Sequence, residues 1–373
     1  MEERLRKLRQ VYAPGHPCPP ELFVGRKEYL DYCKVEVLVP KYEGITPAPA
    51  NAAFLGVWGI GKTSILKYIA ESKAFEEGGF VNLPIIQDFK AIDDLLARAL
   101  ENITTSVSRI EWLKAKVGKK LESISLAPVS LKLGVDRRTL TDHLIQTWSI
   151  LESAGVQHCS ILIDDFHKLS YEDMFSLRSI FQFLPRDGCN YSLVVSGALW
   201  TFLAEPTEPV ARFFDKKPLA PFTPKEVEEA IWKPVELFKI DLSFDEKYVD
   251  ELMKMTLGHP YFVKFITLEL AKRYTKIKGK HIGEHSGDLL GALGKAKFED
   301  DYRRASAGEQ KVLKCIAEKG LGEKFEAKEL KEIKGYPAYL ERLCEKELLN
   351  KEMRGVYSVY HPLFLEWIRR SAT

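Results

Sequence analysis

The chain has 373 residues, of which 45% are hydrophobic and 29% are charged. This balance is that of an ordinary globular protein, it excludes global disorder, and the length suits two or three domains. The net charge of +2 is too small to attract nucleic acid through the electrostatic field of the whole molecule. Any binding of nucleic acid therefore requires a local basic patch.

The apolar stretches are all far shorter than the roughly 18 residues that a membrane span requires. The first residues carry acidic groups and no apolar core, which argues against a signal peptide. We therefore expect a cytoplasmic protein that does not contact membranes. The six cysteines are scattered without metal-ligand spacing and are expected to be reduced and mostly buried.

Residues 1–20 are expected to form a short charged helix and a linker, because several prolines follow the helix. Residues 21–220 then alternate short apolar runs with helical patterns, which predicts an α/β core built on a parallel P-loop sheet. An insertion at about 91–151 interrupts this core, and its alternating residues 129–133 suggest a strand. The four apolar runs expected as buried strands are 54–57, 80–86, 160–163 and 191–195.

The character of the sequence changes after this core, and residues 221–300 are expected to form a helical lid subdomain. Thr223-Pro-Lys-Glu and Ser243-Phe-Asp-Glu each match a capping box at a helix start. Ser306-Ala-Gly-Glu matches a third. It opens residues 301–373, where three helices and a terminal hairpin predict a winged-helix domain.

The most specific motif runs from Gly56 to Ser64 and fits G-x-x-x-x-G-K-[ST] between an apolar strand and a helical run. Its glycines let backbone N–H groups surround phosphate oxygens at a helix start. Lys62 is expected to reach the β- and γ-phosphates, and the Thr63 hydroxyl to ligate Mg²⁺. The residues of this loop expected to contact ATP or ADP are Trp58, Gly59, Ile60, Gly61, Lys62, Thr63 and Ser64.

A second motif completes the predicted site, because the apolar run 160–163 ends in Asp164 and Asp165. Asp164 is expected to hold Mg²⁺ and Asp165 to polarise the attacking water. Two acids at a strand end also occur as a solvated turn. Their position about a hundred residues after a P-loop favours the catalytic interpretation. The two motifs predict an ATPase that works with Mg²⁺ and ATP or ADP.

These motifs, in this order, resemble the archaeal P-loop ATPases of the signal-transduction (STAND) class, which are related to AAA+ proteins and origin-recognition initiators. The resemblance covers about residues 21–370. It implies that five further residues lie at the nucleotide: Phe23, Val24 and Arg26 against the adenine, Pro260 on the base, and Ser196 as a sensor near the γ-phosphate.

Local alternatives exist for these residues, since Ser196 can cap a strand end and Gly258, before Pro260, can cap a helix. The family commonly has Asp-Glu where this chain has Asp164 and Asp165. The shorter Asp165 therefore predicts either that hydrolysis is slow or that another group positions the attacking water. The residues expected to be catalytic are Lys62, Asp165 and Ser196.

Two further roles are implied only by the resemblance. Arg186 stands where an arginine finger of related proteins serves a neighbouring subunit, and it is otherwise an exposed surface arginine. His361 stands where a histidine of the family's switch members contacts ADP, although Pro362 replaces the usual aspartate. Its alternative is a packed residue at a helix start.

The function expected from these features is a nucleotide-dependent switch that acts on a macromolecular partner, either another protein or a second copy. The alternative is an ATP-dependent DNA-binding protein resembling origin-recognition initiators, and a third possibility is a scaffold that barely hydrolyses. The predicted recognition helix, 336–349, carries Glu341, Glu345 and Glu347, which phosphates repel. Any DNA contact is therefore expected to be of the backbone type, through Arg354 and the basic run 272–280.

Overall fold

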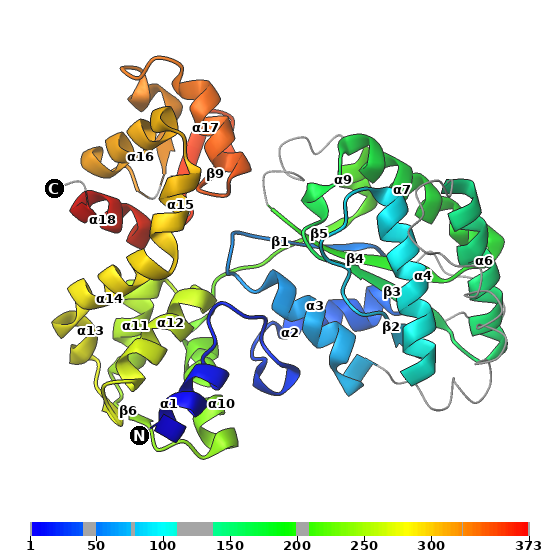
Figure 1. Ribbon diagram of the computed structural model, residues 1–373, viewed down its shortest axis with the longest axis horizontal. Coiled ribbons are helices and arrows are strands. Elements are labelled where there is room, and N and C mark those ends of the chain that lie inside the picture. Colours follow the sequence, from blue (N-terminus) through cyan, green and yellow to red (C-terminus); the bar gives the residue numbers. More distant parts are fainter. Residues whose placement is uncertain are drawn as a thin grey trace.

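The computed structural model describes residues 2–39, 50–75, 79–109, 137–198, 209–322 and 324–371. These residues form a half built on a parallel sheet and a half that is mostly helical (Figure 1). The expected α/β class is confirmed. The strand suggested at residues 129–133 lies outside the described residues.

The first half contains a five-stranded sheet in the order β2-β3-β4-β1-β5, in which all neighbouring strands are parallel. Its strands are β1 (Ala52–Leu55), β2 (Phe80–Asn82), β3 (His158–Ile163), β4 (Tyr191–Gly197) and β5 (Asp215–Pro218). Its α-helices are α2 (Lys27–Tyr32), α3 (Lys62–Glu71), α4 (Ile92–Arg109), α6 (Arg137–Ser153), α7 (Tyr171–Phe183) and α9 (Pro209–Phe213). Short 3₁₀ or π segments are η1 (Pro20–Leu22), η2 (Cys33–Val37), η3 (Lys73–Phe75), η4 (Phe166–Lys168) and η5 (Leu184–Asp187).

Both faces of this sheet are covered, which explains why its strands read as continuous apolar runs. Along β1, Ala53 and Leu55 enter one core cluster while Ala52 and Phe54 enter the other. Helices α4, α6 and α7 pack in the first cluster, and α2 and α3 in the second. Each of the four predicted runs overlaps a parallel strand, although β1 ends at Leu55 and β2 at Asn82, before the predicted ends at 57 and 86.

Strand β5 was not predicted, because three of its four residues are charged and none of them is buried. It pairs only with β1 and forms one edge of the sheet, where exposed polar side chains and a final proline are tolerated. The Tyr32 hydroxyl of α2 donates to Asp215 at 2.7 Å, and the Lys217 ammonium lies 3.6 Å from the Tyr32 ring centroid. These tertiary contacts, rather than apolar pattern, fix the strand.

The second half contains most of the remaining helices and two small sheets. Its α-helices are α1 (Glu2–Val11), α10 (Pro224–Phe238), α11 (Tyr248–Thr256), α12 (Pro260–Ala271), α13 (Lys280–Glu284), α14 (Ser286–Leu293), α15 (Glu299–Arg304), α16 (Ala307–Lys319), α17 (Tyr336–Glu345) and α18 (Pro362–Ser371), with the short segments η6 (Gly294–Phe298) and η7 (Ala327–Leu330). Strands β6 (Ser243–Phe244) and β7 (Lys276–Ile277) pair in parallel. An antiparallel sheet has the order β8-β10-β9, from β8 (Phe325–Glu326), β9 (Leu349–Met353) and β10 (Val356–Val359).

Two of the three predicted capping boxes are confirmed. The Thr223 side chain caps α10, with Pro224 in its first turn, and the Ser306 side chain caps α16. The prediction at Ser243 was wrong, because this residue lies in β6 opposite Lys276, and α11 begins only after Lys247. The backbone at Ser243 pairs with β7, more than thirty residues further along the chain. This tertiary pairing outweighs the local preference for a helix start.

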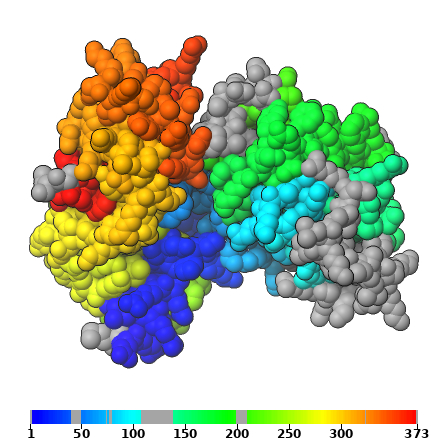
Figure 2. Space-filling model, turned by 45° about the horizontal axis from the view of Figure 1, so that its top comes forward, coloured from blue at the N-terminus to red at the C-terminus, as the bar shows by residue number. Residues whose placement is uncertain are grey.

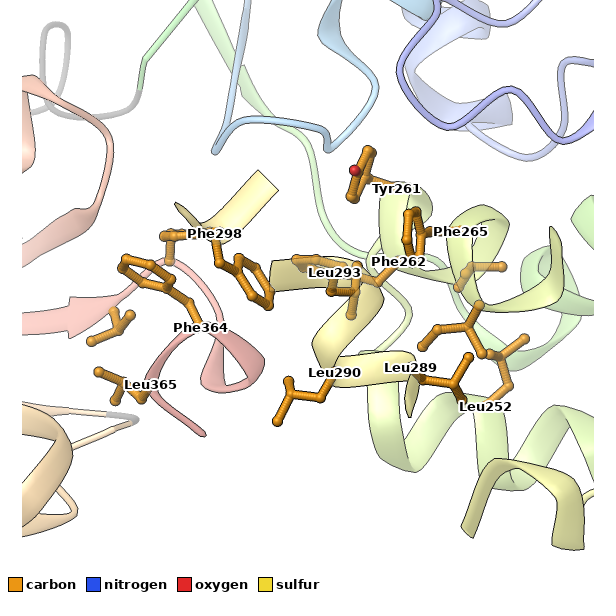
Figure 3. Close-up of a cluster of buried hydrophobic side chains, with 14 of the residues drawn as sticks. Leu252, Tyr261, Phe262, Phe265, Leu289, Leu290, Leu293, Phe298, Phe364 and Leu365 are labelled. Carbon is orange, nitrogen blue, oxygen red and sulfur yellow. The ribbon is translucent and has the colours of Figure 1, made fainter. Parts of the chain in front are cut away.

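One continuous apolar core joins the helical subdomain to the C-terminal residues. Figure 3 shows this core, in which Phe298 of η6 lies beside Phe364 of α18, and their ring centroids are 5.5 Å apart. Helix α1 belongs to the same core, since Leu8 and Tyr12 are fully buried in it. Figure 2 shows the C-terminal residues, in orange and red, against the half that contains the sheet. The helices of residues 221–300 and the C-terminal residues are thus packed around one core.

All six cysteines are free thiols and five of them are buried, as expected. Among the described residues, no helix combines the length and apolar character that crossing a membrane requires. The helices of the second half instead bury their apolar faces in the shared core.

Gly258, in the turn between α11 and α12, ties the helical half to the segment that leads out of the sheet. Its carbonyl accepts the Phe222 N–H at 2.8 Å, and its φ is +72°. A Cβ at Gly258 would lie 2.2 Å from the Phe222 carbonyl oxygen, far inside contact distance. Only glycine suits both the conformation and the space.

We predict that Gly258→Ala lowers the midpoint of thermal unfolding, by an amount equivalent to about 1–3 kcal/mol, because it combines left-handed strain with a backbone clash. Gly291→Ala is the matched control, since no atom lies within 4 Å of a Cβ at this position in α14. The control should be neutral or slightly stabilising. Equal midpoints for the two variants, measured by scanning calorimetry, would contradict the assigned role of Gly258.

Candidate nucleotide-binding site

The P-loop connects the end of β1 to the start of α3 and has the backbone that the motif predicts. Gly59 and Gly61 have φ values of +76° and +106°, and Gly61 is the N-cap of α3. A Cβ on Gly59 would lie 3.0 Å from atoms of His259 and Tyr261, which come from the lid. The loop therefore presents a helix N-terminus, with its unpaired N–H groups, directly beside the helical half.

Lys62 is buried at the centre of this loop. Its ammonium donates to the Gly56 carbonyl at 2.7 Å and to the Val57 carbonyl at 3.2 Å. The side chain is thus folded back over the loop that would hold phosphates. A phosphate group entering the loop would offer it stronger, charge-assisted hydrogen bonds than these neutral carbonyls do.

The carboxylate of Asp164 collects hydrogen bonds from three elements. The Thr63 hydroxyl donates to its Oδ2 at 2.8 Å, and the Gln87 amide donates to the same oxygen at 2.9 Å. The Ser196 hydroxyl, at the end of β4, donates to Oδ1. The structure therefore brings together Thr63, Asp164 and Ser196, which were predicted separately from sequence.

Gln87 was missed by the sequence reasoning. It follows Ile86, which forms a single parallel bridge with Ile163 at the end of β3. Residues that follow neighbouring parallel strands emerge at the same sheet edge, so a polar residue here was the available signal. Its side-chain amide supplies a donor to Asp164, which makes Gln87 a positioning residue for this carboxylate.

The donor set fits a magnesium ion. Thr63 and Asp164 offer hard oxygen atoms 2.8 Å apart at the mouth of the P-loop. Mg²⁺ prefers such oxygens and fills most of its coordination with water and substrate phosphates, so it needs few protein ligands. These two residues are the ones that would hold it.

The carboxylate of Asp165 has a different partner from that of Asp164. Its carboxylate is paired with the Lys168 ammonium at 2.8 Å, and its φ is +52°. Its backbone N–H donates to the Ser196 hydroxyl at 3.0 Å. Burial would raise the pKa of Asp165, but the hydrogen bond from Lys168 and the nearby cations lower that pKa below its ordinary value. The carboxylate is thus ionised at neutral pH.

A cavity on the other side of the P-loop collects the residues expected around the adenine. Phe23 stacks on Tyr68 of α3, with ring centroids 4.6 Å apart. Apolar and aromatic side chains such as those lining this cavity suit a flat heteroaromatic base. The residues lining the cavity are Cys18, Leu22, Phe23, Val24, Arg26, Ile60, Gly61, Ser64, Phe222, Pro260 and Lys264.

Arg26 lies at this cavity but is engaged with backbone. Its guanidinium donates to the Ile60 carbonyl of the P-loop at 2.9 Å and to the Ala220 carbonyl. Its own N–H donates to Glu226 at 3.0 Å, and burial lowers its pKa. Arg26 therefore links the P-loop to the segment that enters the lid.

His361 and His259 lie side by side, with ring centroids 5.6 Å apart. The His361 Nε2–H donates to the Thr256 carbonyl at 2.9 Å, and its Nδ1 accepts the Leu363 N–H at 3.2 Å. Both ring nitrogens of His361 are thus used within the helical half. His259 is the histidine that faces the P-loop, since its Nε2–H donates to the Trp58 carbonyl at 3.1 Å.

Trp58 and Arg186 are the remaining predicted residues. The Trp58 ring packs edge-on against Tyr261, with centroids 4.6 Å apart, and the Lys297 ammonium lies 3.7 Å from its centroid. Trp58 thus joins the P-loop to the lid. Arg186 is exposed and stacks over Phe183, with its guanidinium 4.7 Å from the ring centroid.

The sheet order and the P-loop define an AAA+-like P-loop fold, and two solved structures share this fold. The chain is similar to the ORC2 protein of Aeropyrum pernix solved as ADPNP-ADP complexes, with a TM-score of 0.55, 16% identity and 97% of each chain covered. The ADP form of that protein gives a TM-score of 0.53, 17% identity and 98% coverage of each chain. Neither a protein-family model nor a curated relative matches the chain.

The buried His361 yields a prediction about acid stability. Desolvation lowers its pKa to about 4, from an ordinary 6.5. The unfolded chain therefore binds a proton at higher pH than the folded chain does, so stability falls as pH drops from about 6.5 towards 4. Its contribution is roughly 3 kcal/mol at most.

We predict that His361→Gln flattens the decrease of the thermal midpoint across this pH range, because the substituted side chain does not titrate. His16→Gln, at an exposed position, serves as the control and should follow the wild-type profile. Midpoints are measured by calorimetry at several pH values. A His361→Gln profile parallel to that of the wild type would show that the imidazole is not buried in its neutral form.

Proposed function

We propose that this chain is a P-loop ATPase that binds and hydrolyses Mg-ATP and acts as a nucleotide-dependent switch on a macromolecular partner. The observation that carries the proposal is the hydrogen-bonded cluster of Thr63, Asp164 and Ser196 beside Lys62. It combines oxygen ligands, a buried cation and a helix N-terminus at one sheet edge. This combination suits a nucleoside triphosphate.

Each residue has a defined part in this chemistry. Lys62 turns from the Gly56 carbonyl to the β- and γ-phosphates, where it offsets the charge that builds on the transferring phosphoryl group. Thr63 and Asp164 would hold Mg²⁺, which would supply positive charge against the phosphates. Ser196 anchors Asp164 and the backbone of Asp165 on the γ-phosphate side.

Asp165 orients the attacking water in this proposal, and its arrangement supports slow hydrolysis. The carboxylate is held by Lys168 at 2.8 Å and so must be released before it can accept a proton from water. The side chain is also one methylene shorter than the glutamate common in the resembled family. Both features reduce the fraction of molecules in which the Asp165 carboxylate is placed to orient the attacking water.

The adenine is proposed to bind in the cavity lined by Phe23, Val24 and Pro260, with Arg26 holding the P-loop in place. The ORC2 protein of Aeropyrum pernix was solved with ADPNP and ADP, which supports nucleotide binding by this similar fold. In the proposed cycle, His361 would contact ADP only after giving up the Thr256 carbonyl. That contact stays a prediction.

The proposed domain plan keeps the boundaries expected from sequence: an N-terminal segment (1–20), an ATPase core (21–220), a lid (221–300) and a winged-helix domain (301–373). Support for the winged helix comes from α16, η7 and α17 packed with the β8-β10-β9 sheet. Membership of the STAND class is proposed on the sequence resemblance alone. Packing of this domain against the P-loop supports a switch.

The partner is proposed to be a protein or a second copy of the chain, which Arg186, on the surface, could reach as an arginine finger. DNA binding stays the alternative. In α17, Glu341 and Glu345 are exposed and would repel phosphates. Several residues of the basic run 272–280 already pair with acids, among them Arg273 with Asp288 at 2.8 Å. The geometry thus favours a protein partner.

We predict that Lys62→Ala lowers the rate of ATP hydrolysis by about 10²-fold or more, since it removes a cation aimed at developing charge. Lys67→Ala is the matched control, because Lys67 lies further along α3, where its ammonium pairs with Glu71 at 2.8 Å. Phosphate release with Mg-ATP is the measurement, with and without duplex DNA. Unchanged turnover in Lys62→Ala would refute the site.

We predict that Asp165→Asn retains Mg-ATP binding but loses most hydrolysis, because an amide cannot accept the proton of water as a carboxylate does. Asp164→Asn should instead raise the Mg²⁺ concentration needed for activity. The control is Asp187→Asn, at an exposed position of η5. Binding is followed by calorimetry and hydrolysis by phosphate release, and normal hydrolysis in Asp165→Asn would place the catalytic acid elsewhere.

A further inference from the structure

Glu347, just after α17, reaches the P-loop from the C-terminal domain. One carboxylate oxygen, Oε2, lies 3.6 Å from the Lys62 ammonium. The other, Oε1, lies 3.8 Å from Nε2 of His167, which belongs to η4 in the sheet half, two residues after Asp165. The Glu347 side chain is only 24% exposed, and that of Lys62 only 9%. The pair is therefore shielded from solvent, where an ion pair is stronger than at the surface.

The backbone holds Glu347 in this position. Its φ is +57°, an uncommon value for a residue with a side chain, and its N–H donates to the Cys344 carbonyl at 2.9 Å. Residues in uncommon conformations persist where the surroundings determine them and often mark functional contacts. The turn that ends α17 thus directs a carboxylate towards the sheet half.

The neighbours of Glu347 also lie against the nucleotide site. A narrow cavity is enclosed by two residues of the P-loop, one residue after β4, Glu347 itself and the start of β9: Gly56, Val57, Ala198, Glu347, Leu349, Asn350 and Lys351. Gly56 and Val57 supply the two carbonyls that the Lys62 ammonium contacts. The C-terminal domain therefore touches the loop at the lysine that would bind phosphate.

A carboxylate in this place has the charge of a phosphate and uses the same cation. A nucleotide phosphate bound to Lys62 would bring two like charges within a few ångströms of each other in a partly buried site, which is unfavourable. Glu347 and the phosphates therefore compete for Lys62. The neighbouring residue of the loop, Thr63, donates its hydroxyl to Asp164 instead.

We propose that Glu347 is an internal competitor of the nucleotide phosphates, which holds the C-terminal domain against the empty P-loop and releases it when Mg-ATP binds. This regulation rests on the proposed function of the P-loop as an ATP site. By thermodynamic linkage, a contact that closes the domain weakens nucleotide binding, and nucleotide binding weakens the contact by the same factor.

The structure indicates which part of the chain moves. The C-terminal domain shares its apolar core with the lid, including the Phe298 and Phe364 pair in Figure 3, so separating these two would expose a large apolar surface. The contacts between the halves are individual side-chain contacts such as Glu347 with Lys62 and Trp58 with Tyr261. The lid and the C-terminal domain therefore swing together, away from the P-loop.

The test compares Glu347→Gln with wild type, since this change removes the charge and keeps the shape. Its matched control is Glu345→Gln, which removes an exposed carboxylate at the end of α17. Calorimetric titration with Mg-ATP should show at least about fivefold tighter binding for Glu347→Gln, the lower end of typical coupling between sites. Glu345→Gln should bind as the wild type does. Equal affinities for all three proteins would overturn the proposal.

A conformational measurement complements the titration. Small-angle X-ray scattering should show a larger radius of gyration for wild type with Mg-ATP than without it. Glu347→Lys, which places a cation opposite Lys62, should be expanded already without nucleotide. A wild type that keeps its dimensions on saturation with Mg-ATP would contradict the release of the domain.

Failure of this proposal can be told apart from failure of the ATP site. If Mg-ATP binds wild type and binding is lost in Lys62→Ala, the nucleotide site stands, and an unchanged affinity in Glu347→Gln refutes the competitor alone. If Mg-ATP binds neither wild type nor Glu347→Gln, both proposals fail. Tight binding that Lys62→Ala leaves unchanged would refute the P-loop assignment itself.

Discussion

The buried carboxylate of Asp164 is the point on which the nucleotide site depends. Because β3 lies between β2 and β4, and β4 lies beside β1, the residues that follow these parallel strands meet at one edge. A buried carboxylate is tolerated only when its oxygens are satisfied, and here donors come from Thr63, Gln87 and Ser196. The strand order brings these three donors to Asp164, and their hydrogen bonds in turn stabilise the ends of the strands. Together they set the distance between the P-loop and the acidic pair, Asp164 and Asp165.

The features that could be predicted from the sequence are those determined by residues close together in the chain. The P-loop, Asp164 and the buried strands were predictable because a short motif or an apolar run contains their whole physical cause. Strand β5 was not, since contacts with Tyr32 hold its polar residues in the sheet. The capping box at Ser243 was wrong for the same reason, because a pairing with β7 outweighed a helix start.

The acidic residues of α17 show a second limit of sequence reasoning. Glu341, Glu345 and Glu347 were all interpreted as one surface that repels phosphates. In the structure Glu347 leaves the helix, turns back with a left-handed backbone and faces Lys62 at 3.6 Å. Nothing local in the sequence distinguishes it from Glu345, since its partner belongs to a motif almost three hundred residues earlier. An ion pair between residues this far apart in the chain cannot be predicted from local sequence and is found only in the folded structure.

The path of the chain between the two halves restricts how they can move. Helix α1 packs in the helical half, whereas α2 packs on the sheet, so the chain crosses once within residues 13–26. It crosses back within residues 219–223, and Arg26 bonds the Ala220 carbonyl where the two crossings meet. Two neighbouring backbone crossings act as a hinge. The helical half can rotate about them easily, whereas sliding or twisting it relative to the sheet half would strain both crossings. Shortening either crossing should therefore stiffen the molecule more than any single surface substitution.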